Sequence, residues 1–224
     1  MKRCIPGPLL NSLLLTFPSL YQTPLVNFES NLDADGLEDL RECLEKVAQL
    51  PGDVVELGSS RCGTAIHLAR WLRERGIAKV VYACDSFEGF DRQELAKEQT
   101  AKLTTLTDDA HTSTSFEYVS KKLRALGFAE TVKPVKGYFR ETLPTLGGPF
   151  CLALIDCDLQ ESMTYCAAWA FEKLVPGGLI AFDDYGSKSL QGAKLAVDEF
   201  VEKFKGRISD SGLGRRLYRV RKNS

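Results

Sequence analysis

The sequence predicts a doubly wound, Rossmann-like α/β fold with a mostly parallel sheet and an antiparallel hairpin at its C-terminal end. Three observations predict it. Short apolar runs alternate with amphipathic segments, the runs are apolar on both faces, and only a few residues join the last two runs. Alternation of this kind is typical of a parallel sheet covered by helices on both sides. A chain of 224 residues has room for one such domain.

Each predicted strand is followed by a segment with helical spacing of apolar residues, as crossover connections require. The predicted strands are Val54–Gly58, Val80–Asp85, Val132–Gly137, Leu152–Cys157 and Leu179–Tyr185. The predicted helices are Asp35–Leu50, Thr64–Arg75, Phe116–Leu126, Ser162–Leu174 and Leu190–Phe204.

The two ends of the chain depart from this repeat. Arg207–Ser211 and Arg215–Arg221 are predicted to pair as an antiparallel hairpin through the glycines at 212 and 214. We expect residues 1–50 to form an N-terminal arm and helix that serve as a lid or interface, and residues 51–224 to form the α/β domain. Residues 91–115 are polar and weakly periodic, which favours an active-site loop or lid.

Composition argues against several classes of partner. The net charge is −1 and the basic residues are dispersed, so we expect neither nucleic acid nor a membrane as partner. The number of cysteines, seven, is odd, and none form a CxxC pair, which favours reduced thiols in the cytoplasm over disulfides or a zinc site. The apolar stretch near the N-terminus is short and interrupted by Pro6 and Pro8, unlike a signal peptide or membrane span.

A glycine turn follows the first predicted strand in the sequence ELGSSRCG, from Glu56 to Gly63. Gly58 allows a sharp turn and close approach of a ligand, and Gly63 lets the next helix start close to the strand. Ser60 stands where a pyrophosphate-binding turn has its middle glycine, so a ligand without phosphate, such as S-adenosylmethionine, fits better than NAD. A plain tight turn without ligand is the alternative.

The next two strand ends support a nucleoside ligand. Asp85 is placed to accept hydrogen bonds from ribose hydroxyls. Gly137 and Tyr138 could flank an adenine ring, although Tyr138 and Phe139 would also suit an ordinary core. The predicted cofactor-binding residues are Glu56, Gly58, Ser59, Ser60, Gly63, Asp85, Ser86, Phe87, Gly137, Tyr138 and Asp156.

Four carboxylates follow the fourth and fifth predicted strands, namely Asp156, Asp158, Asp183 and Asp184. Neighbouring parallel strands bring their carboxyl ends together, so these side chains should converge and repel one another unless a cation relieves them. Mg²⁺ prefers such oxygen ligands and would lower the pKa of a substrate hydroxyl, leaving one carboxylate as general base. The alternative is that these residues only cap helices and form turns.

Several motifs resemble the macrocin O-methyltransferase family. They are DSFEG at 85–89, GYFRETLP at 137–144, DCDLQES at 156–162, PGG at 176–178 and DDYG at 183–186. Cys157 and Gln160 depart from the family's usual glycine and tyrosine.

The resemblance implies an S-adenosylmethionine-dependent, Mg²⁺-dependent O-methyltransferase that acts on a small-molecule hydroxyl, often a sugar of a natural product. It implies Asp156, Asp183 and Asp184 as metal ligands, Asp158 as general base, and a region before the first strand that serves in a lid and in homo-oligomer contacts. Three alternatives remain: a metal-independent or nitrogen-directed methyltransferase, an NAD-dependent oxidoreductase, and a non-catalytic regulator.

Overall fold

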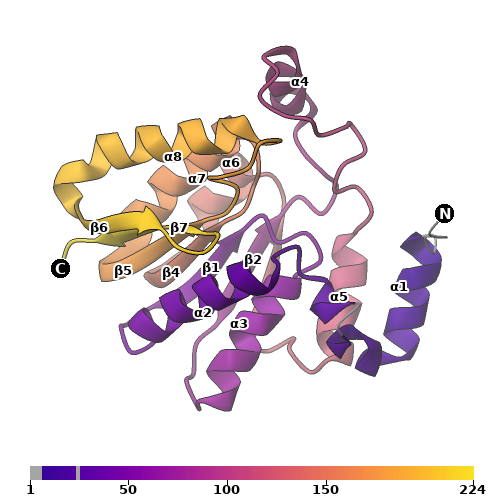
Figure 1. Cartoon of the computed structure of the whole chain (residues 1–224). Helices are drawn as coiled ribbons and strands as arrows, with labels where there is room; N and C mark the ends of the chain where they lie inside the picture. The colour runs from indigo at the N-terminus through magenta and orange to yellow at the C-terminus, as the bar shows by residue number, and fades with distance from the viewer. Residues whose placement is uncertain (1–6, 24–25) are drawn as a thin grey trace.

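A computed structural model describes residues 7–23 and 26–224 and contains one seven-stranded sheet in the order β3-β2-β1-β4-β5-β7-β6 (Figure 1). The first five strands along the chain run parallel, and β7 is antiparallel to both β5 and β6. The strands are β1 Asp53–Leu57, β2 Val81–Asp85, β3 Val132–Lys136, β4 Phe150–Ile155, β5 Leu174–Phe182, β6 Ile208–Leu213 and β7 Tyr218–Lys222. This topology confirms the predicted fold class.

Helices cover the sheet on both sides (Figure 1). The buried faces of α2, α3 and α5 form one core with the sheet, and those of α7 and α8 form the other. The helices are α1 Gly7–Thr16, α2 Ala34–Val47, α3 Gly63–Glu74, α4 Arg92–Thr100, α5 Phe116–Ala125, α6 Phe139–Thr142, α7 Gln160–Lys173 and α8 Gln191–Phe204, with 3₁₀ turns η1 Pro18–Gln22, η2 Asn27–Glu29, η3 Leu143–Thr145 and η4 Lys205–Arg207. Within the described part of the chain, no helix has both the length and the apolar character needed to cross a bilayer.

The central strands are apolar throughout because consecutive side chains enter opposite cores. Val54 packs into the core with α2 and α3, and its neighbour Val55 packs into the core with α7 and α8. Leu152 and Ala153 of β4 divide in the same way, and all four side chains are fully buried. Burial on both faces removes the polar alternation that a one-sided sheet would show.

The sheet order fixes where a ligand can bind. From β1 the chain proceeds outward through β2 and β3, then returns to β4 on the other side of β1. The β1–β4 boundary is therefore the switch point at which ligands bind in open α/β sheets. Leu57 is level with Ile155, which is level with Phe182, so the residues that follow β1, β4 and β5 meet at one edge.

Two elements differ from the sequence-based expectation. Residues 91–115 were expected to form a loop or lid, but the structure contains the helix α4 there. The Asp91 side chain caps this helix by accepting hydrogen bonds from the N–H groups of Gln93 and Glu94. Among its residues only Leu95 and Glu98 are buried, so no apolar stripe revealed it. Likewise α1 lies in the expected N-terminal arm, of which residues 1–6 lie outside the described residues.

The C-terminal hairpin has a longer turn than expected, and β7 begins at Tyr218. The backbone N–H groups of Arg216 and Leu217 donate to the buried Asp39 carboxylate of α2, at 2.8 and 2.9 Å. Because those groups serve a side chain, they are not available to a strand ladder.

Candidate functional site

A cavity of about 590 Å³ opens at the carboxyl ends of the parallel strands, within the range of about 300–1,000 Å³ that is usual for ligand pockets. It is lined by most of the residues that the sequence pointed to for cofactor binding. These are Gly58, Ser60, Asp85, Ser86, Gly137, Tyr138 and Asp156.

Gly58 is required by close packing as well as by its backbone angle. Its φ is +95°, and a Cβ atom there would lie 1.7 Å from the backbone oxygen of Asp156. Gly63, by contrast, makes room for the N-terminal segment, since a Cβ atom would lie 2.2 Å from the Ser30 backbone nitrogen. Gly63 does not line the cavity.

Asp85 joins the loops that follow β1 and β2 at one end of the cavity. One carboxylate oxygen accepts from the Ser60 N–H and the other from the Phe87 N–H, both at 2.7 Å. A carboxylate has about four lone-pair sites, so these two bonds orient it and leave acceptor capacity for ligand hydroxyls.

Three of the predicted cofactor residues, Glu56, Ser59 and Phe87, lie beneath the cavity surface, at 1%, 5% and 1% exposure. Burial raises the pKa of Glu56 to about 8, and its Oε2 has no hydrogen-bond partner among the described residues. These three side chains therefore do not line the cavity.

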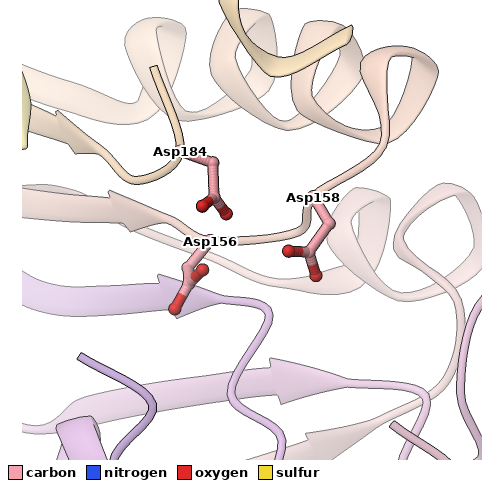
Figure 2. A group of neighbouring side chains, drawn as sticks. All are labelled: Asp156, Asp158 and Asp184. Atoms are coloured by element: carbon pink, nitrogen blue, oxygen red, sulfur yellow. The ribbon is translucent and has the colours of Figure 1, made fainter. Parts of the chain in front are cut away.

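The carboxylates of Asp156, Asp158 and Asp184 converge, with one oxygen from each lying within 4.8 Å of the others (Figure 2). Asp156 and Asp158 follow β4, and Asp184 follows β5. Asp158 and Asp184 both have left-handed backbone conformations, with φ of 61° and 58°. Such strain in a non-glycine residue is typical of functional sites.

Mutual repulsion and burial change the protonation of this group. Burial, followed by the charges of Asp183 and Asp158, raises the pKa of Asp156 well above its usual range. Burial and the neighbouring Asp184 do the same to the pKa of Asp158, and burial and Asp183 raise the pKa of Asp184 to about 6. The hard oxygen donors and the excess of negative charge fit a divalent cation such as Mg²⁺.

Asp183 lines the same cavity, but its two carboxylate oxygens accept hydrogen bonds from Arg216 Nε at 2.8 Å and Nη2 at 2.7 Å. The fourth predicted carboxylate is therefore bound by a guanidinium and lies outside the converging group.

An N-terminal segment that the motifs did not reveal lies against the glycine turn. Glu29 pairs with Arg61 of that turn and accepts from Tyr118 Oη at 2.6 Å. Ser30 Oγ lies 2.7 Å from Thr64 Oγ1, and Asn31 lines the cavity. These contacts join residues distant in sequence, so no local pattern could have signalled them.

Aromatic and charged side chains that sequence reasoning also missed line the same cavity. The Arg140 guanidinium lies 4.9 Å from the centre of the Tyr165 ring. The rings of Phe90 and His111 meet edge to face at 5.2 Å, and burial lowers the pKa of His111. His111 lies in the polar segment 91–115, and only the folding of that segment brings it to the cavity.

Comparison with known proteins identifies relatives of this chain. The family model for macrocin O-methyltransferases matches residues 29–209. A 4′-O-methyltransferase of Streptomyces olivaceus, named for 8-demethyl-8-(2,3-dimethoxy-α-L-rhamnosyl)-tetracenomycin C, is 31% identical over 184 residues, covering 78% of this chain and 67% of the relative.

Solved structures show the same fold. The O-methyltransferase NovP is 24% identical, with a TM-score of 0.74 over 97% of this chain and 100% of that one. The calicheamicin methyltransferase CalS11 is 19% identical, with a TM-score of 0.64 over 96% of this chain and 91% of that one.

Proposed function

This chain belongs to the macrocin O-methyltransferase family of S-adenosylmethionine-dependent methyltransferases, and we propose that it methylates a sugar hydroxyl of a natural product with the help of Mg²⁺. The relative in S. olivaceus is named for methylation at the 4′ position of a rhamnosyl tetracenomycin. Its 31% identity over most of this chain supports the same class of acceptor here.

The observation that carries the proposal is the position of the three converging carboxylates beside the glycine turn. Gly58 and Asp156 are in contact through their backbones, so the donor pocket and the acidic group share a wall. S-Adenosylmethionine, when bound, supplies a methyl group activated by its sulfonium charge. Asp85 would orient the ribose hydroxyls, and Ser60 and Gly58 would line the remainder of the donor.

We assign Asp156, Asp183 and Asp184, which all line the cavity, to hold the cation, and Asp158 to accept the proton. Mg²⁺ commonly keeps further positions for water and substrate oxygens. Mg²⁺, when bound, supplies positive charge that helps a hydroxyl to ionise near neutral pH. Asp158 lies within 4.8 Å of the other two carboxylates, where it can receive the proton that the hydroxyl loses.

The residues around the cavity then align donor and acceptor. Tyr165, Arg140 and Leu190 line the same cavity, and a sugar bound against them would present its hydroxyl to the methyl group. Alignment of this kind is the main source of rate in a simple displacement.

Two further parts of the proposal concern the whole protein. Helix α1 and the residue that follows it expose Leu9, Leu13 and Phe17, spaced four residues apart, and we assign this stripe to contact between copies of the chain.

The six cysteines in the described part of the chain are buried free thiols. Their state suits a reducing compartment, so we place the reaction in the cytoplasm.

The experiment is a transfer assay with deuteromethyl S-adenosylmethionine and rhamnosylated aglycones, read by mass spectrometry, with and without a chelator. We expect a deuteromethyl ether on the sugar, loss of turnover on chelation, and its return with Mg²⁺. Asp184→Asn should abolish turnover, whereas Asp210→Asn, on exposed β6, should not. Transfer that persists with a chelator would remove the cation, and a product methylated only on the aglycone would refute the sugar acceptor.

A further inference from the structure

A buried lysine lies behind the glycine turn, outside every motif that the sequence analysis singled out. Lys122 of α5 is 0% exposed and does not line the cavity. Burial lowers its pKa, which reflects the cost of keeping an ammonium group away from water. A buried charge persists where close partners offset this cost, so its partners indicate what it does.

The Lys122 ammonium has an acceptor for each of its N–H donors. Nζ donates to the backbone oxygen of Phe28 at 2.6 Å and to that of Arg61 at 2.7 Å. It also lies 3.0 Å from Glu29 Oε2. One buried ammonium therefore joins α5 to the 3₁₀ turn η2 and to the glycine turn after β1.

Both backbone oxygens belong to segments with left-handed backbone conformations. The φ angles lie between 44° and 63° throughout Asn27–Glu29, and on either side of Arg61 they are 43° at Ser60 and 55° at Cys62. This conformation is unfavourable for residues other than glycine, so it persists only where surrounding contacts hold it. The Lys122 ammonium bonds to a carbonyl in each segment and supplies such a contact to both.

The two segments held in this way contribute residues to the cavity. Ser60, next to Arg61, lines the cavity and donates its N–H to the Asp85 carboxylate at 2.7 Å. Asn31, which follows η2, lines the cavity as well. A shift of the Arg61 carbonyl would therefore move the Ser60 N–H and change the orientation of Asp85, the residue assigned to the ribose hydroxyls.

We propose that Lys122 is a positioning residue for the methyl donor, which fixes the glycine turn against the N-terminal segment and thereby orients Asp85. This inference rests on the donor pocket of the proposed function. Because the ammonium lies outside the cavity, its effect on a ligand is carried by the turn. The inference involves neither the cation nor the acceptor, so the product of the donor alone can test it.

The test is the affinity for S-adenosylhomocysteine, measured by calorimetry on the full chain without acceptor or Mg²⁺. Lys122→Met keeps a long, unbranched side chain but has no N–H donor. We expect its dissociation constant to rise by about tenfold, a change of about 1.4 kcal/mol, with the binding stoichiometry unchanged. A purely structural role would instead leave fewer folded molecules, which lowers the stoichiometry but not the affinity of those that remain folded.

The residues on either side of Lys122 provide matched controls. Lys121→Met makes the same change on the surface of α5, where Lys121 pairs with the exposed Glu117. Leu123→Ala removes buried apolar volume from the same helix and should lower Tm. We expect both controls to bind S-adenosylhomocysteine with the affinity of the wild type.

A second variant serves if Lys122→Met does not fold. Glu29→Gln/Lys122→Met removes one charge of each sign, so it keeps the net charge of the wild type and leaves no carboxylate without its ammonium partner. The carbonyls of Phe28 and Arg61 still lack their donor. We therefore expect the same loss of affinity, about tenfold.

Two results would overturn the inference and leave the proposed function standing. One is wild-type affinity in Lys122→Met, or in the double variant where only that one folds. The other is an equal loss of affinity in either control, because a general effect on α5 would then explain the change. A wild-type protein that binds no S-adenosylhomocysteine would refute the donor pocket of the proposed function and this inference with it.

Discussion

Glu94 of α4 caps α7 by accepting two hydrogen bonds from Ser162, one from its backbone N–H at 2.6 Å and one from its Oγ at 2.7 Å. The N-cap residue of α7 is Leu159, which has no side-chain acceptor, and Glu98 of α4 accepts from the Gln160 N–H as well. The helix that covers the site thus supplies the cap for the helix that follows Asp158. A cap at the positive end of a helix is worth about 0.5–2 kcal/mol.

Glu94→Ala should therefore loosen both α4 and the turn that carries Asp158. We expect the free energy of unfolding to fall by about 1–2 kcal/mol and the Gln160 and Ser162 amides to exchange hydrogen faster. The control is Glu161→Gln, also in the first turn of α7, whose exposed pair with Lys97 should contribute little. Unchanged amide exchange in Glu94→Ala would contradict the capping role.

The raised pKa of Asp184 predicts how pH changes the stability of the protein and its affinity for Mg²⁺. Its pKa in the folded protein is about 6, above the usual 3.8. Between these values the folded state binds more protons than the unfolded state, so this contribution to stability is present at low pH and is lost as pH rises through about 6. Mg²⁺ competes with the proton, so its affinity should fall as pH decreases through 6.

Thermal unfolding between pH 5 and 8, with and without Mg²⁺, measures this effect. Stabilisation by Mg²⁺ should be larger at pH 8 than at pH 5, and Asp184→Asn should remove most of the difference. An equal shift in Tm at both pH values would argue against binding at these carboxylates.

The raised pKa of Glu56 predicts a second effect of pH on stability, which does not involve the cation. Because burial raises its pKa from 4.5 to about 8, the folded protein holds this proton where the unfolded chain releases it. The wild type should lose stability relative to Glu56→Gln as pH rises from 4.5 to 8, by up to about 1.4 kcal/mol per pH unit. Urea unfolding of both proteins at pH 5 and pH 9 tests this, and a constant difference would refute a protonated Glu56.

Gly58→Ala should be far more damaging than Gly76→Ala. Both glycines have positive φ, but a Cβ atom meets the Asp156 backbone at position 58 and nothing within 4 Å at position 76. We expect a loss of about 1 kcal/mol for Gly76→Ala from backbone strain alone, and about 3 kcal/mol or more for Gly58→Ala. Binding of S-adenosylhomocysteine, followed by calorimetry, should be lost only in Gly58→Ala.

Leu13→Asp tests the proposed contact between copies. A charge in the centre of the α1 stripe should shift sedimentation toward the monomer. Leu195, on α8, is exposed to a similar degree, at 43% against 38% for Leu13, so Leu195→Asp is a control that should leave sedimentation unchanged. A wild-type protein that sediments as a monomer at all concentrations would refute self-association through α1.

Several parts of the molecule could be predicted because their causes are local in sequence. The continuous apolar character of β1 and β4, the glycine at 58 and the aspartates after β4 and β5 follow directly from burial on both faces and from turn geometry. Helix α4 could not be predicted in this way, since it is held by carboxylates that bond to another helix. The position of the N-terminal segment around Glu29 could not be predicted either, because its partners Arg61 and Tyr118 are distant in sequence.

The sequence by itself therefore determined the α/β fold, the edge of the sheet where the site lies, and the gathering of acidic residues there, because strand ends and their following residues are set by short-range patterns. Only the tertiary structure decided which carboxylates meet. Asp183 and Asp184 are neighbours in sequence, yet one turns toward Arg216 of the hairpin and the other toward Asp158. That division depends on a side chain that arrives from a distant strand turn, and long-range packing of this kind leaves no local signal in the sequence.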